Sequence, residues 1–272
     1  MARGGTEADQ QPHLWDNHVS VYEAVFQPFS LAFAGIAIEA LGLVAGQKVL
    51  DVGAGSGGSA LALARAGCRV AAIDASAQMV ERTMRRAGSL GSTVDARVMD
   101  GQALAFADAT FDAALSVFGV ILFADAVQGL SEMRRVVRPG GKVAIVTWTE
   151  PQNYELASEL RAAAMSVLSD VPAAPLPAQL RYREEADFAA LFRSADFASP
   201  VIAVHTATLR APSARWLGAR LAFAPGMAAQ LASFGPRAGE IVAAFVSRIE
   251  ARQGAGAIRL SGRAFVGTAA VT

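Results

Sequence analysis

The stretch VLDVGAGSGG at residues 49–58 decides the fold class, because an apolar strand pattern with one acid, Asp51, runs directly into a glycine-rich turn. Its glycines at positions 53, 55 and 58 match the G-x-G-x-x-G spacing of nucleotide-binding turns. Glycine lets the backbone pass close to a ligand, and the following helix offers unpaired N–H groups and the positive end of its dipole. The stretch therefore predicts a strand, a ligand-binding turn and a helix, but this spacing fits several nucleotide-like cofactors.

The segments after this turn alternate between strand and helix patterns. Short apolar or β-branched runs are separated by stretches with helical spacing, and Ser76 is a suitable N-cap for one helix. This alternation predicts parallel crossovers and an α/β fold with helices on both faces of the sheet. Strands are expected at 48–53, 68–74, 93–100, 111–118 and 142–148, helices at 58–67, 77–88 and 124–137, and a turn at 138–141.

The flanks of this core predict mostly helices and two more strands. We expect a helical cap at 1–46, a ligand-binding core at 47–150, and a C-terminal part at 151–272 with a helical insertion at about 211–256. The last two strands are expected to be antiparallel to each other. The segments are two helices within 15–42 broken at Pro28, helices at 154–170 and 184–197, a proline-rich loop at 170–179, strands at 201–209 and 258–271, and about two helices within 213–253 interrupted at Pro225 and Pro236.

Composition limits the class of ligand. Lys and Arg together number 24, as do Asp and Glu, and no run of like charges occurs, so neither nucleic acid nor a membrane is an expected partner. The single Cys68 excludes an internal disulfide and a cysteine metal cluster, and we expect no metal site. The first residues lack the apolar core of a secretory signal. We expect a cytoplasmic monomer or homodimer that acts on a small molecule.

Three acids bear on the choice of cofactor. Asp74 ends the second strand, 21 residues after Gly53, where a carboxylate accepts hydrogen bonds from ribose hydroxyls; NAD enzymes use the same spacing. Asp51 would repel a pyrophosphate but would attract a ligand with an ammonium and a sulfonium, although it could instead accept loop N–H groups. Asp100 with Gly101 follows the third strand, where the pair could contact an adenine or simply form a turn.

The quoted segments together resemble the class I S-adenosylmethionine-dependent methyltransferases, in particular the branch with the ubiquinone and menaquinone C-methyltransferases. The matching pieces are VLDVGAGSGG, VAAIDAS, VMDGQALAF with FDAALSVFGV, and VVRPGGKVAIVTW, within residues 47–148. The resemblance implies a Rossmann-like sheet of seven strands, six parallel and one reversed. It also implies methyl transfer from S-adenosyl-L-methionine to a small molecule, with S-adenosyl-L-homocysteine as the product.

The resemblance also assigns roles to positions in the core. Asp51 would lie near the ammonium of the methionine part, and Asp74 would hold the ribose. The remaining roles are the methionine loop (Gly53, Ala54, Gly55 and Gly57), the adenine site (Asp100 and Gly101, with Ala75, Met79 and Gln102 packed around it), and the neighbourhood of the transferred methyl (Ser116, Val117 and Phe118).

No strong catalytic motif is expected, because a sulfonium is already an activated methyl donor and alignment of the reactants supplies much of the rate. A base is needed only where the acceptor must lose a proton. His18 and Tyr22 lie four residues apart, share a helix face and are the candidate bases, ahead of His205. Tyr22, Phe26, Phe123 and Trp148 are the candidate acceptor-pocket residues, although such aromatics could also be core.

Two other functions fit the same residues: an NAD-dependent oxidoreductase, and a catalytically silent module that keeps the cofactor fold. The acceptor is left open as quinone-like, polyketide-like or another secondary metabolite. Methylation at carbon, oxygen and nitrogen all fit the sequence.

Overall fold

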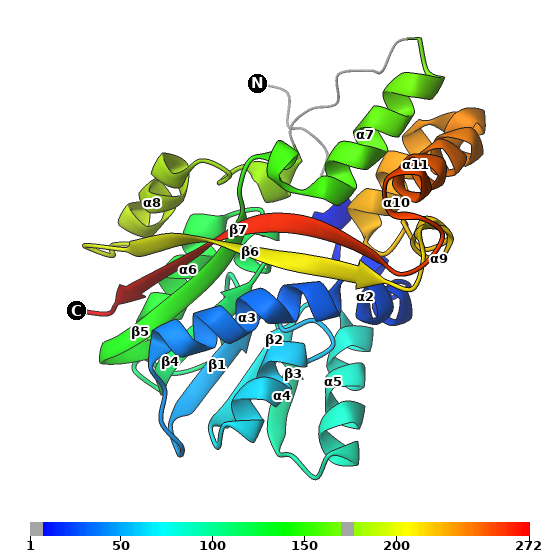
Figure 1. Ribbon diagram of the computed structural model, residues 1–272. Helices are drawn as coiled ribbons and strands as arrows, with labels where there is room; N and C mark the ends of the chain where they lie inside the picture. Colours follow the sequence, from blue (N-terminus) through cyan, green and yellow to red (C-terminus); the bar gives the residue numbers. More distant parts are fainter. Residues whose placement is uncertain (1–7, 170–176) are drawn as a thin grey trace.

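The computed structural model describes residues 8–169 and 177–272, and these form one seven-stranded sheet in the order β3-β2-β1-β4-β5-β7-β6 (Figure 1). β7 is antiparallel to both β5 and β6, and the other neighbouring strands are parallel. The predicted sheet of six parallel strands and one reversed strand is confirmed. The strands are β1 (Lys48–Val52), β2 (Arg69–Asp74), β3 (Val94–Val98), β4 (Phe111–Val117), β5 (Val137–Trp148), β6 (Val201–Ala211) and β7 (Ile258–Ala270).

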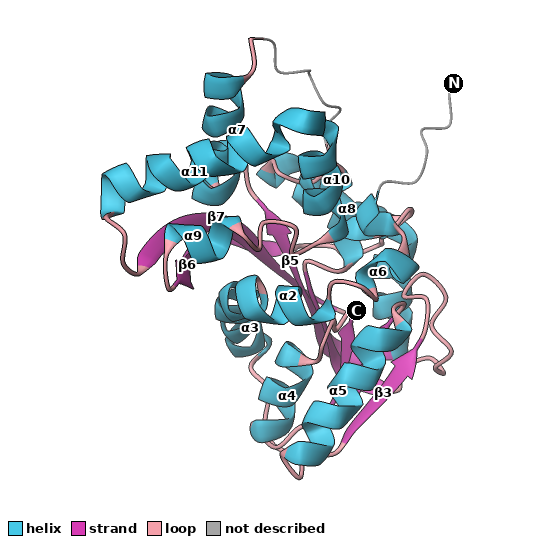
Figure 2. Cartoon of the chain, turned by 90° about the vertical axis from the view of Figure 1, so that its right-hand side faces the viewer, coloured by secondary structure: helices cyan, strands magenta, loops and turns pink. Residues whose placement is uncertain are grey.

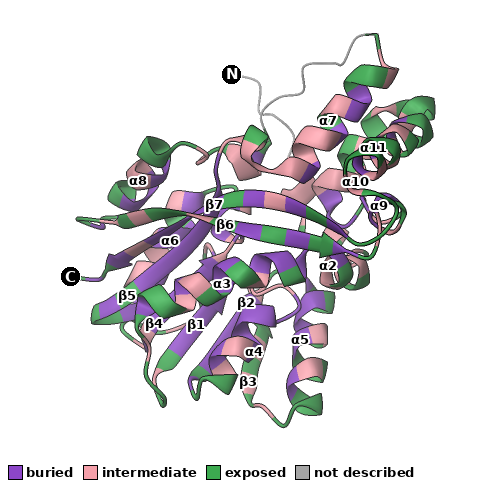
Figure 3. Cartoon of the chain, in the orientation of Figure 1, coloured by how far each residue is buried: buried purple, intermediate pink, exposed green. Residues whose placement is uncertain are grey.

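Alternate residues of the central strands enter two separate apolar cores. On β1, Val49 packs with α3 (Gln27–Leu41) and α4 (Gly58–Arg65), and its neighbour Leu50 belongs to the opposite core with α6 (Ala126–Val136) and α8 (Glu185–Ser194). Figure 3 shows the buried residues concentrated along the central strands. Burial on both faces explains why these strands read as nearly continuous apolar runs.

The helix α5 (Ala77–Ser89) packs against β2 and β3. Its N-cap is Ser76, whose hydroxyl accepts the amide of Met79 at 3.1 Å as expected. Gly88 does not end this helix. The helix continues to Ser89, and Gly91, with φ of 62°, adopts the left-handed conformation just beyond it.

The N-terminal segment contains more elements than the sequence predicted. It comprises the 3-10 turn η1 (Ala8–Gln10), α1 (Pro12–Trp15), α2 (Val19–Val25) and then α3. The helices break at Phe26 rather than at Pro28, because proline lies in the first turn of α3, where its missing N–H costs no hydrogen bond. No single helix in the described ranges is long and apolar enough to span a membrane; α2 and α3 meet that length and composition test only as a pair bent by 68°.

The C-terminal part adds helices at one end of the sheet. The helix α7 (Glu155–Val167) packs against α11 (Ala238–Gln253), and both lie near α10 (Pro225–Ser233) in Figure 2. The insertion between β6 and β7 holds these last two helices and also α9 (Ala214–Gly218), so the expectation of about two helices was too low. The predicted proline-rich loop lies largely outside the described residues.

The RPGG segment at 138–141 lies within β5 and is not a separate turn. Phe111 pairs with Val137, but Ala113 pairs with Lys142, so the register of the β4–β5 ladder shifts across this segment. The extra residues form an irregularity at the edge of the ladder, where Gly140 has φ of 79°.

We expect Gly57→Ala to destabilise the fold by about 1–3 kcal/mol. Gly57 has φ of 83°, and a Cβ there would lie 2.6 Å from Cγ2 and 2.7 Å from Oγ1 of Thr83. The matched control is Gly239→Ala in α11, where no atom lies within 4 Å of the added Cβ. The control should be neutral or stabilise by up to about 1 kcal/mol in urea unfolding. Equal stability of the two variants would contradict this account of the turn.

Candidate active site

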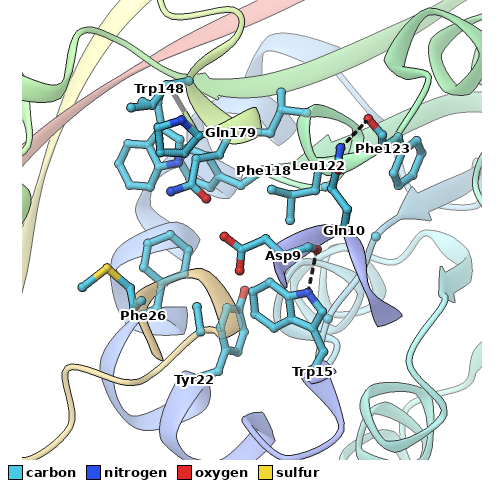
Figure 4. A pocket seen from close by; sticks show the side chains of 18 of the residues that line it. Asp9, Gln10, Trp15, Tyr22, Phe26, Phe118, Leu122, Phe123, Trp148 and Gln179 are labelled. Carbon is cyan, nitrogen blue, oxygen red and sulfur yellow. Dashed lines mark hydrogen bonds between the residues drawn. The ribbon is translucent and has the colours of Figure 1, made fainter. Parts of the chain in front are cut away.

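A cavity of about 1140 Å³ lies at the carboxyl ends of the parallel strands (Figure 4). Its walls come from the glycine-rich turn, the ends of β2, β4 and β5, the N-terminal segment, and the helices α7 and α10. Sites for one small ligand usually occupy about 300–1,000 Å³. The cavity therefore has room for a cofactor and a second small molecule.

Most residues predicted for the site line this cavity. Those on or just after separate strands are brought to one edge by the parallel sheet, and the others come from α2, α5 and loops. Those that line it are Tyr22, Phe26, Gly53, Gly55, Asp74, Ala75, Met79, Asp100, Gly101, Gln102, Val117, Phe118, Phe123 and Trp148; those that do not are His18, Asp51, Ala54, Gly57 and Ser116.

Asp74 fixes the shape of the glycine-rich turn. One carboxylate oxygen accepts the amide of Gly55 at 2.8 Å, and the other accepts the amide of Ser76 at 2.9 Å. Burial raises the pKa of Asp74, and the backbone hydrogen bonds partly offset that effect. A carboxylate has about four acceptor sites, so these hydrogen bonds do not use all of its lone pairs.

Asp51 is buried directly beneath the turn, with 1% of its surface exposed. Within the described ranges neither carboxylate oxygen has a hydrogen-bond partner of normal geometry, although the Ser59 hydroxyl and the Ala60 amide are near enough to lower the pKa. Burial is the largest effect and, together with the nearby Asp74 carboxylate, raises the pKa of Asp51 to about 7. Burying an ionised carboxylate without a partner costs folding free energy, and a positive charge placed nearby would reduce that cost.

The loop after β3 closes another side of the cavity. Asp100 is exposed, and its Oδ1 accepts the backbone and side-chain amides of Gln102 at 2.9 Å and 3.1 Å. Gly101 is buried, and a Cβ there would lie 2.4 Å from the ring of Phe123. Glycine is therefore needed for Phe123 to pack against this loop.

Ser116 holds the strand ends together. It is fully buried; its hydroxyl donates to the carbonyl of Val52 at 2.8 Å and accepts the amide of Val120 at 3.0 Å. Phe118 lies two residues later, with φ of 58°, a conformation that non-glycine residues seldom adopt. This backbone directs its ring to 4.5 Å from that of Trp148, in the cavity wall.

The two candidate bases differ in position. His18 lies outside the cavity lining, and its Nδ1 is 2.7 Å from the carbonyl oxygen of Leu14. Tyr22 lines the cavity, and burial raises its pKa to about 12. At neutral pH the Tyr22 phenol therefore stays protonated and is a poor proton acceptor. His205, on β6, also lies outside the lining.

The half of the cavity away from Asp74 is aromatic. The Phe26 ring lies 5.8 Å from Trp148 and stacks on Phe223 at 5.6 Å, and Trp148 stacks on Tyr154 at 4.7 Å. Figure 4 shows Phe26, Phe118 and Trp148 on this side of the cavity. The sequence reading missed Phe223 and Tyr154 as individual residues, because neither belongs to a motif.

The N-terminal segment crosses the cavity. Oδ1 of Asp9 accepts the amide of Gly226 on α10 at 2.7 Å, and the Asp9 carbonyl accepts the indole N–H of Trp15 at 3.0 Å (Figure 4). Asp16 accepts the hydroxyl of Ser76 at 2.6 Å. The same short segment therefore contacts both the helical insertion and the end of β2.

Residues 49–141 match the family described as methyltransferase domain. The match begins at β1 and ends in β5, and so includes the glycine-rich turn, Asp74 and the loop after β3. Residues 49–141 are therefore similar to a methyltransferase domain.

The chain is also similar to several proteins and solved structures, of which the solved structures show the fold alone. The chain is 35% identical over 142 residues to an uncharacterised protein of Mycobacterium tuberculosis, covering 52% of each chain. It is 35% identical over 153 residues to the demethylmenaquinone methyltransferase of Beutenbergia cavernae, covering 53% of this chain and 62% of the relative. The matches thus span about half to three fifths of these relatives. A putative methyltransferase from Bacillus halodurans has the same fold, with a TM-score of 0.58, 18% identity, and coverage of 88% of this chain and 98% of the other.

We expect Asp51→Asn to stabilise the fold increasingly as pH rises. The unfolded carboxyl ionises above about pH 4, whereas the folded one keeps its proton up to about pH 7, so stability is lost as pH rises through this window. The gain over wild type should grow by on the order of 3 kcal/mol between about pH 5 and pH 8. Urea unfolding at several pH values measures it. The exposed Asp95→Asn is the control, and an equal trend in both variants would contradict the assignment.

Proposed function

We propose that the chain transfers a methyl group from S-adenosylmethionine to a small, largely apolar acceptor. The observation that carries the proposal is a single cavity with two chemically different halves. One half presents Asp74 and Asp100 around the glycine-rich turn, with Asp51 buried behind it, and the other half is aromatic. The methyltransferase family match over 49–141 supports the same function.

The residues fit the cofactor by charge and by shape. Asp51 would balance the ammonium of the methionine part, and Asp74 would accept hydrogen bonds from the ribose hydroxyls through its remaining lone pairs. Asp100, on the exposed loop after β3, would lie beside the adenine. When bound, the cofactor supplies an activated methyl group on a sulfonium.

The protein's contribution is alignment and exclusion of water. The aromatic wall of Phe26, Phe118 and Trp148 would hold a flat acceptor against the cofactor half, and the N-terminal segment would limit access of water. Fixing two reactants at near-contact distance can contribute about 7–11 kcal/mol in favourable cases. Specialised acid–base residues are then unnecessary for many acceptors.

A quinone-like acceptor is the favoured candidate. A reduced quinone ring is flat, mostly apolar and nucleophilic, and matches the aromatic half of the cavity. Relatives 35% and 39% identical to parts of this chain are named demethylmenaquinone methyltransferase, which supports this choice. Incorporation of labelled methyl from S-adenosylmethionine into reduced 1,4-naphthoquinone tests it directly.

We expect Asp74→Ala to weaken S-adenosylhomocysteine binding by roughly 1.5–3 kcal/mol, or about ten- to 150-fold, because charge-assisted hydrogen bonds to the ribose are lost. Calorimetric titration measures the change. Asp95→Ala is the matched control, because Asp95 is an exposed acid on β3 that pairs with Arg97 and does not line the cavity.

Unchanged affinity in Asp74→Ala would refute the ribose assignment. Wild-type protein that binds NADH but not S-adenosylhomocysteine would refute the proposed methyltransferase function itself.

A further inference from the structure

Arg161 is the one basic side chain among the described residues that line the cavity. The acids lining it are Asp74 and Asp100 on the cofactor side, and Asp9, whose Oδ1 accepts the amide of Gly226. Arg161 is exposed, and no described residue forms a hydrogen bond or ion pair with its guanidinium. A cation without a partner among the described residues thus borders a space that several aromatic rings line.

The helix α7 places Arg161 on its cavity face. Tyr154, Ala157, Arg161 and Ala164 all line the cavity, and their spacing of three, four and three residues puts them on one side of the helix. The two alanines project little beyond the backbone, so Arg161 is the only long side chain between them. This face leaves space for a flat molecule, with the guanidinium at its edge.

The other charges of α7 are paired away from the cavity. Glu159 accepts hydrogen bonds from Arg248 at 3.0 Å and Arg252 at 2.7 Å, and Arg252 also lies 3.6 Å from Glu155. Both arginines belong to α11, which packs on α7. These ion pairs use the acids of α7 that could otherwise have neutralised Arg161.

Among the described residues that line the aromatic half, Asp9 is the one carboxylate, and its Oδ1 already accepts the amide of Gly226. Tyr22 stays protonated at neutral pH, His18 lies outside the lining, and burial raises the pKa of Tyr154. An acceptor that enters as an anion needs no such base. It does need a counter-charge, which Arg161 offers.

We propose, building on the methyltransferase function, that the aromatic half binds a planar acceptor whose acidic oxygen is ionised, and that Arg161 pairs with this oxygen. The acceptor class is then a phenolate, enolate or aromatic carboxylate. Arg161 acts as a specificity-determining residue, because it favours the anionic form of the acceptor and fixes the edge of the ring at α7.

Charge and electrons balance without a protein base. The acceptor anion gives an electron pair to the methyl carbon, while the bond from that carbon to sulfur breaks and leaves its pair on sulfur. Anion and sulfonium both become neutral. Attack through oxygen releases no proton, whereas attack through a ring carbon of a phenolate releases that carbon's proton to water.

The test uses the full chain and a matched pair of probes, 2-naphthoate and its neutral amide 2-naphthamide, titrated calorimetrically at a pH where the carboxylate is ionised. We expect wild type to bind naphthoate about tenfold or more tightly than naphthamide, and added salt to reduce that preference. Arg161→Gln should abolish the preference and Arg161→Lys should retain part of it. Arg69→Gln, which removes an exposed arginine at the start of β2, should leave it unchanged.

Equal binding of the two probes by wild type, no binding of either, or a full preference in Arg161→Gln would overturn the proposal. Thermal unfolding of the variants checks that each is folded. S-adenosylhomocysteine is titrated separately into the same samples. If wild type does not bind S-adenosylhomocysteine, the methyltransferase function is refuted. If wild type prefers naphthoate but Arg161→Gln keeps that preference, only the acceptor assignment is refuted.

Discussion

The parallel pairing of β1 with β2 and β4 is the constraint on which the site depends. It aligns Asp51 with Ala72 on one side and Leu115 on the other, and so brings the ends of three strands to one edge of the sheet. The chain must leave each strand there, and the glycine-rich turn makes its exit between Tyr22 and Gly119. The cofactor half of the cavity follows from this arrangement.

Burial of the Asp51 carboxylate lowers the free energy of unfolding, whereas the packing of the sheet raises it. The Asp51 carboxylate is 1% exposed and has no hydrogen bond of normal geometry within the described residues. An apolar residue at this position would pack in the core without the free-energy cost of burying a carboxylate. Asp74, by contrast, is stabilised by the amides of Gly55 and Ser76 and shapes the turn. The two acids lie on adjacent strands, but only Asp74 has a clear structural role; the position of Asp51 is one of the observations that support the proposed cationic ligand.

The sequence predicted several of the strand-end residues that line the cavity, because the signals for them are local. The spacing of Gly53, Asp74 and Asp100 places each residue at the end of a strand, and the parallel sheet brings these strand ends to one edge. Ser116 illustrates the limit of that logic, because position at a strand end does not reveal that its hydroxyl faces Val52. The break at Phe26 rather than Pro28 shows the same limit, since proline fits both a break and a first turn.

The acceptor half could not be read in the same way, because distant segments form it. The rings of Phe26, Trp148 and Phe223 come into contact only in the folded chain. Arg161 has no acidic partner on α7 because arginines of α11 pair with Glu159, and the sequence does not reveal this pairing. No spacing rule connects such residues. Composition hinted at the aromatic N-terminal segment, but not at its partners.

The N-terminal segment joins the two halves of the cavity physically. Asp16 accepts the hydroxyl of Ser76, and the neighbouring amide of Ser76 binds Asp74, so this end of the segment is fixed beside the cofactor half. Asp9, at the other end, accepts the amide of Gly226 on α10, whose Cβ position Asp9 already fills. Two ligands that share this cavity would therefore share one covering segment. Its contacts near Asp74, through Asp16, and near α10, through Asp9, are separated by only a few residues of the chain.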